Sequence, residues 1–161
     1  MRTRELVYGA LLTAFSLVIP LAFGGYLRVI IPPFTATLAS HVPVMLSMLF
    51  SPLVAFLVGV GSTIGFLIVA GPVVAARAAV HIIIGVLGAL LIRQGRPYRF
   101  ALLVTAPVHA LGEAFIVLPF GFDLFHGLYV VGVGTLLHHG IDALIALLLV
   151  GTLHLSLGLG R

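Results

Sequence analysis

Residues 72–93 read PVVAARAAVHIIIGVLGALLIR, an apolar stretch that nevertheless contains Arg77 and His81. It is longer than the roughly 20 residues that an α-helix needs to cross the hydrocarbon core of a bilayer. A charge near the bilayer centre costs roughly 2.5–3.5 kcal/mol on insertion scales, and such side chains face a bundle interior or a wet cavity. The stretch therefore predicts a membrane-spanning helix with one polar face.

The composition of the whole chain agrees with that prediction. Its 161 residues are 61% hydrophobic and 7% charged, and the mean hydropathy is +1.31. A soluble domain carries about 25% charged residues, so the chain is expected to be an integral membrane protein. The absence of cysteine excludes disulfides, a thiolate nucleophile and a cysteine metal site.

Five further apolar stretches flank the first, separated by Gly, Pro and Arg-rich turns. Six spans of about 20 residues leave room for loops but not for a soluble catalytic domain. The run 6–23 is too long for a signal-peptide core and is interpreted as a permanent span. The expected fold is an all-α, six-transmembrane-helix bundle forming a single domain over residues 1–161, with spans at 4–23, 36–51, 53–70, 72–93, 99–118 and 127–155.

The arginines set the expected orientation. All positive side chains are Arg, and six of the eight lie at the amino terminus, in the loop between the fourth and fifth spans, or at the carboxyl terminus. With six spans these three regions share one side of the membrane. By the positive-inside rule, both termini are predicted to be cytoplasmic.

Polar residues recur at i,i+4 spacing on three of the predicted helices, which places each pair on one helix face. Counted at 1.5 Å per residue, they and a further His in the second span fall mostly in the outer half of the membrane. The sequence therefore predicts a polar pocket open to the outside, lined by Arg77, His81, His109, Glu113, His138, Asp142 and His41.

Each of these residues also has a plainer interpretation. Arg77 either forms a neutralising ion pair with Glu113 or Asp142, or binds a substrate carboxylate through its planar fork. The histidines are not expected to hold a metal, since there is no His-Glu-x-x-His helix and the nearby Arg repels cations. Only one of His138 and His139 can face the pocket, because adjacent helical residues point about 100° apart.

Several other features admit two readings. Ala10 and Ala14 lie on one face of the first span and could serve ordinary packing inside the bundle. The segment 61–65, GSTIG, is assigned to such packing. The stiff loop 32–35, PPFT, is either a connector or a lid over the pocket. Phe115 or Tyr129 could stack on a ligand ring.

Taken together, these features resemble a substrate-binding S component of an energy-coupling factor (ECF) vitamin transporter. The resemblance rests on six spans in a short chain, the Ala-x-x-x-Ala face, the stretch 34–43, FTATLASHVP, and Ser51-Pro52 before a Gly-rich helix. The stretch 131–135, VGVGT, followed by a His and an Asp, also fits. The likeness covers nearly the whole chain.

The resemblance implies a division of labour. Such a protein binds one vitamin tightly and hydrolyses no ATP. It works with a membrane coupling subunit and two cytoplasmic ATPase subunits, and it lies in the bacterial plasma membrane. Ala10 and Ala14 would then form the surface that meets the coupling subunit. No cofactor or nucleic acid is expected.

The stretches 38–43, LASHVP, and 77–81, RAAVH, look most like the niacin-type branch. Nicotinate is a small planar anion with one ring nitrogen, so Arg77 could neutralise its carboxylate while a His or Glu113 addresses the ring nitrogen. Pantothenate or a queuosine precursor remain alternatives. An intramembrane His/Glu enzyme and a channel are further alternatives, distinguished by action without partners and by the absence of tight, saturable binding.

Overall fold

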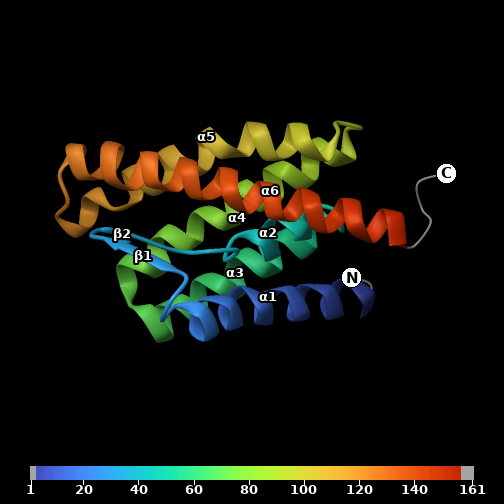
Figure 1. The fold of residues 1–161 in the computed structure, drawn as a ribbon, viewed down its shortest axis with the longest axis horizontal. Coiled ribbons are helices and arrows are strands. Elements are labelled where there is room, and N and C mark those ends of the chain that lie inside the picture. The colour runs from blue at the N-terminus through green and yellow to red at the C-terminus, as the bar shows by residue number, and fades with distance from the viewer. Residues whose placement is uncertain (1–2, 157–161) are drawn as a thin grey trace.

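The computed structural model describes residues 3–156, which form a bundle of long helices (Figure 1). Among these residues, five helices are long and apolar enough to cross a membrane. The prediction of a helical membrane protein is thereby confirmed. The five are α1 (Thr3–Phe23), α3 (Pro52–Ala70), α4 (Pro72–Arg93), α5 (Tyr98–Ile116, followed by a 3-10 turn at Leu118–Phe120) and the π-helical turn His126–Gly132 continued by α6 (Val133–Ser156).

The single helix predicted over 36–51 is wrong. Its place is taken by an antiparallel hairpin of β1 (Arg28–Ile31) and β2 (Phe34–Thr37), then a turn, then the short helix α2 (Val42–Ser47). Pro32 and Pro33 form the tip of the hairpin, and Ala39 has a φ of 66°, a conformation that ends regular structure. With six residues, α2 is only about 9 Å long and cannot span a bilayer.

Although it is not a spanning helix, this segment still returns the chain across the bundle. The hairpin lies at the end of the bundle where α1 finishes, and α2 leads back toward the end where α3 starts (Figure 1). There the Ser51 hydroxyl donates to a Glu5 carboxylate oxygen at 2.9 Å. The start of α1 and the end of α6 consequently lie at the same end of the bundle. That this end faces the cytoplasm stays a prediction.

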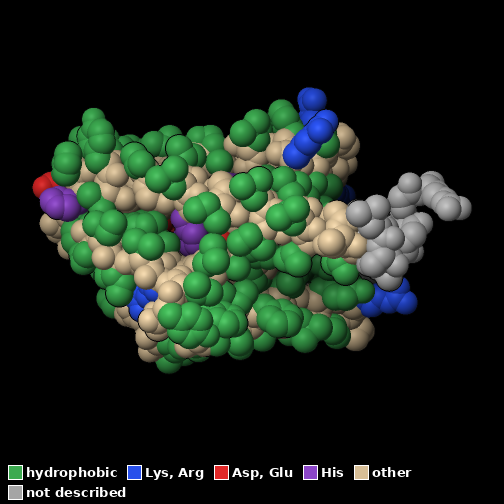
Figure 2. All heavy atoms as spheres, viewed as in Figure 1, with side chains coloured by type: hydrophobic (Ala, Val, Ile, Leu, Met, Phe, Trp, Pro, Cys, Tyr) green, Lys and Arg blue, Asp and Glu red, His purple; other side chains and the backbone are tan. Residues whose placement is uncertain are grey.

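The outer surface of the bundle is apolar. Figure 2 shows hydrophobic side chains covering most of this face, with Arg side chains mainly toward one end. Leu103 is 72% exposed and Ile68 is 79% exposed, as expected for side chains that meet lipid rather than water. Ala10 and Ala14 are also exposed, so they do not serve packing inside the bundle.

Glycines set the close approach of neighbouring helices. A Cβ at Gly59 of α3 would lie 2.7 Å from the backbone Cα of Ile82 on α4. Cβ atoms at Gly61 and Gly65 would meet α1 side chains at 2.4 Å. The assignment of 61–65 to helix packing is therefore confirmed, and α3 is the helix on which α1 and α4 both pack.

We expect Gly59→Ala to destabilise the protein by about 1–3 kcal/mol, because the added methyl meets backbone that cannot rotate away. Thermal unfolding in detergent would measure this as a lower midpoint. The matched control is Gly140→Ala on α6, where an added Cβ meets nothing within 4 Å. An unchanged midpoint for Gly59→Ala would show that α3 and α4 pack less closely than described.

Candidate functional site

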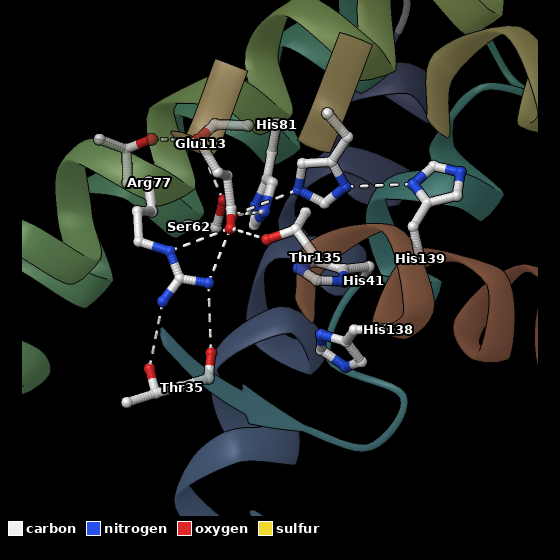
Figure 3. Close-up of polar contacts among 12 residues, drawn as sticks. Thr35, His41, Ser62, Arg77, His81, Glu113, Thr135, His138 and His139 are labelled. Carbon is white, nitrogen blue, oxygen red and sulfur yellow. Dashed lines mark hydrogen bonds and ion pairs between the residues drawn. The ribbon is translucent and has the colours of Figure 1, made fainter. Parts of the chain in front are cut away.

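The polar residues predicted to share a pocket do come together (Figure 3). Two come from α4, two from α5, two from α6, and one from the turn before α2. All of them are less than 9% exposed although they lie among apolar helices. The members of this polar cluster are Arg77, His81, His109, Glu113, His138, Asp142 and His41.

Glu113 is at the centre of the cluster, and its two carboxylate oxygens have different partners. Arg77 donates to Oε2 from Nε at 2.9 Å and from Nη2 at 2.7 Å. The Thr135 hydroxyl on α6 donates to the same oxygen. The other oxygen, Oε1, lies 3.3 Å from Nε2 of His109 and 3.8 Å from Nε2 of His81. Oε2 thus accepts from three donors, whereas the partners found for Oε1 among residues 3–156 are imidazoles.

Arg77 joins this carboxylate to the hairpin. Its Nη1 donates to the Pro33 carbonyl at 3.3 Å and to the Thr35 hydroxyl at 3.5 Å, and its Nη2 donates to the Thr35 carbonyl at 3.3 Å. The guanidinium carbon also lies 5.3 Å from the Phe34 ring centroid, within cation–π range. Of the two roles that the sequence allowed for Arg77, the ion pair with Glu113 is formed.

Asp142 holds the turn between β2 and α2. Its Oδ1 accepts the Ala39 N–H at 2.8 Å, and its Oδ2 accepts the His41 N–H at 2.9 Å. Non-helical backbone at membrane depth is tolerated only where protein satisfies it, and this carboxylate satisfies two donors at once. Nε2 of His138, one helical turn away, lies 3.2 Å from Oδ2 and 3.0 Å from the Thr37 carbonyl oxygen.

Five imidazoles form a continuous group, and that of His41 contacts three of the others. The ring centroid of His41 lies 4.7 Å from that of His81, 4.6 Å from that of His109 and 4.3 Å from that of His138. His109 in turn contacts His139 through their Nδ1 atoms at 3.1 Å. His139 was not among the predicted site residues, and the only signal for it was its position beside His138.

A cavity of about 120 Å³ opens beside the cluster, between the hairpin and the ends of α1, α3 and α4. Five of the predicted residues line it, while His109 and Asp142 lie behind the wall and contact those that do. Phe66 is the aromatic side chain in the lining, and Phe115 and Tyr129 are not part of it. Three polar lining residues were not among the predicted site residues, namely Thr35, Thr37 and Ser40, and the sequence left open whether Arg28 contacts a ligand.

These features define a class of protein: a membrane protein with a small polar cavity bordered by a hairpin. Over 94 residues, 58% of its length, the chain is 38% identical to the niacin transporter NiaX of Lactococcus lactis subsp. cremoris (strain MG1363). The predicted resemblance to a niacin-type transporter is thereby confirmed. The matched part spans 41% of that relative's length. No family model and no solved structure matches the chain.

We expect Asp142→Asn to loosen the segment 34–48, because an amide has one acceptor oxygen and its NH₂ would face a backbone donor. Leaving one buried donor unsatisfied costs about 1–3 kcal/mol, so amide hydrogen exchange across this segment should quicken by about tenfold or more. The control is Asp123→Asn, which alters an exposed cap on the His126 N–H. Unchanged exchange in Asp142→Asn would contradict this role for the carboxylate.

Proposed function

We propose that this protein is the membrane-embedded, substrate-binding subunit of an ECF-type vitamin importer, and that its ligand is nicotinate. The observation that carries the choice of ligand is the 38% identity to a niacin transporter. The cavity supports the proposal, because it combines cationic, hydroxyl and imidazole groups with an apolar wall. It is small beside the 300–1,000 Å³ of typical drug-sized sites, which favours a ligand of one ring.

The lining of the cavity contains groups that suit each part of such a molecule. Phe66, Val69 and Val74 provide an apolar wall that suits a flat ring. The lining also contains two arginines, Arg28 and Arg77, and the imidazoles of His41 and His81. We place the carboxylate toward the arginines and the pyridine nitrogen toward the imidazoles. Burial of the ring then contributes affinity, while the polar groups fix its orientation.

Within this proposal, Nη1 is the part of Arg77 that binds the carboxylate. Nε and Nη2 are committed to Glu113, whereas the contacts of Nη1 to the hairpin are the longer ones, at 3.3 and 3.5 Å. A carboxylate that took these donors would replace the Pro33 carbonyl and the Thr35 hydroxyl. Ligand binding would thereby be coupled to the position of the hairpin.

The surroundings of the hairpin fit a lid. One side of β2 borders the polar cavity, and the hairpin also borders a separate apolar groove of about 510 Å³ beside α6. The β1 residues Arg28–Ile31 are all exposed, so few contacts hold the outer strand. We propose that the hairpin moves to admit the ligand and that Arg77 holds it closed.

The partners follow from the resemblance together with the surface of α1. Ala10 and Ala14 are exposed, with Val7, Leu11 and Val18 exposed on the same helix. Small residues let another helix approach closely in a membrane. We propose that this face meets the coupling subunit and that two ATPase subunits on the cytoplasmic side drive transport.

Calorimetric titration of the purified, ligand-stripped protein tests the proposed ligand. We expect tight one-to-one binding of nicotinate and at least tenfold weaker binding of nicotinamide, since a hydrogen bond to a charged group is worth about 1.5–3 kcal/mol. Arg77→Lys should weaken nicotinate binding by about tenfold, because it keeps the charge but loses the fork.

The control is Arg96→Lys, an exposed arginine between α4 and α5 at the opposite end of the bundle from the hairpin. Absence of heat with nicotinate would refute this ligand. Equal affinity for the acid and the amide would refute the carboxylate placement.

Uptake of labelled nicotinate by cells that contain the coupling module tests the α1 face. We expect Ala14→Trp to abolish uptake while calorimetry shows unchanged binding, because the large ring keeps the partner helix away. Leu103→Trp is the control, since Leu103 is 72% exposed on α5, across the bundle from α1 (Figure 1). Normal uptake by Ala14→Trp would mean that the coupling subunit binds elsewhere.

A further inference from the structure

Four buried metal-ligating groups converge beside the cavity: His41, His81, His109 and Glu113. One donor atom from each lies within 4.8 Å of the others. All four residues are less than 9% exposed. Nε2 of His81 has no hydrogen-bond partner among the described residues. A buried polar atom without a partner is costly, so this group of atoms calls for an occupant.

The hydrogen bonds of His139 and His109 indicate which of their ring nitrogens carry a proton. The Leu102 carbonyl lies 3.0 Å from Nε2 of His139, which must therefore donate to it. A neutral His139 then accepts at Nδ1, so Nδ1 of His109 must donate to it. The remaining nitrogen of a neutral His109, Nε2, carries a lone pair.

The lone pair on Nε2 of His109 faces another hydrogen-bond acceptor. Nε2 of His109 lies 3.3 Å from Oε1 of Glu113, whose carboxylate is ion-paired with Arg77. Two acceptors thus confront each other in the interior of the protein. The Leu102 carbonyl and the Glu113 carboxylate, at the two ends of this series of contacts, are both acceptors. The three contacts of the series need three N–H groups, and two neutral imidazoles supply two. A proton or a metal ion between His109 and Glu113 would satisfy both acceptors.

We propose that His41, His81, His109 and Glu113 bind a divalent transition-metal ion. An extra proton would complete only the link between His109 and Glu113, and it would leave His81 Nε2 without a partner. A metal ion takes the lone pairs of all three imidazoles together with Oε1. The proposal concerns the ion alone and does not depend on nicotinate as the ligand of the cavity.

The groups behind the four ligands match a metal site. Ligating histidines usually give their second ring N–H to a carboxylate, a carbonyl or water, and ligating carboxylates are themselves hydrogen-bonded. Here Asp142 Oδ2 lies 3.3 Å from Nδ1 of His41, and His139 fixes the tautomer of His109. Arg77 and Thr135 hold Glu113 by Oε2, which leaves Oε1 directed at the imidazoles.

Charge and distance are both compatible with a divalent ion. The positive charge of Arg77 is balanced by Glu113, and Asp142 adds a second carboxylate behind His41. Ligand atoms around tetrahedral zinc, at about 2.1 Å from the metal, are about 3.4 Å apart. The donor atoms, within 4.8 Å, therefore reach the ion by side-chain rotation. Three imidazoles and one carboxylate suit Zn²⁺, Co²⁺ or Ni²⁺ rather than Mg²⁺ or Ca²⁺.

The test is metal binding by the full chain in detergent, purified without a polyhistidine tag and stripped with a chelator. We expect one Zn²⁺ per protein by elemental mass spectrometry after dialysis, and visible d–d absorption when Co²⁺ replaces it. His81→Ala should weaken Zn²⁺ binding at least tenfold. The matched control is His126→Ala, since the His126 side chain is 46% exposed and pairs with Asp123 between α5 and α6, outside the polar cluster.

Circular dichroism would establish that each variant is folded. The Co²⁺ spectrum is measured on the unaltered protein, so it tests the site even if a variant fails to fold. The proposal is overturned if the protein retains no stoichiometric Zn²⁺ and gives no Co²⁺ bands. A proton shared by His109 and Glu113 would then join the two acceptors. Equal Zn²⁺ affinity in His81→Ala and His126→Ala overturns it as well. Nicotinate is absent from every measurement, so failure here is distinct from failure of the proposed function.

Discussion

The ion pair between Glu113 and Arg77 is the interaction on which the rest of the structure depends. Glu113 lies on α5, Arg77 on α4 and Thr135 on α6, and Arg77 carries the link on to the hairpin at Thr35. Removing one partner of a buried ion pair typically costs 3–5 kcal/mol, because the other charge stays unpaired. In this bundle the two charges therefore keep three helices and the hairpin in one arrangement.

Buried polar side chains also explain how a hairpin can exist where a spanning helix would be expected. Backbone N–H and C=O groups cannot remain unsatisfied in lipid. The turn after β2 meets this requirement through Asp142, which accepts two of its backbone donors, and through His138 at the Thr37 carbonyl. Side chains of α6 thus replace the hydrogen bonds that a helix would have made within itself.

These contacts also shape the cavity and give the proposed transport function a physical basis. Because α2 is short, the hairpin and the turn leave space between α1, α3 and α4 that a full helix would have filled. Arg77 contacts both the cavity and the hairpin. A ligand that competes for this guanidinium can alter how firmly the hairpin is held, which links binding to opening.

The sequence by itself determined the class of protein, the five long helices and the polar residues at i,i+4 spacing, because these follow from local hydropathy and helix periodicity. It did not determine the secondary structure of residues 36–51, the contacts of Thr35 or the presence of His139 in the cluster. An apolar stretch suits a spanning helix and a covered hairpin equally well. The choice depends on Asp142, which binds the Ala39 N–H from 103 positions away. Only the tertiary structure brings such a partner into place, because hydrogen-bond satisfaction in lipid is decided by which segments are neighbours in space.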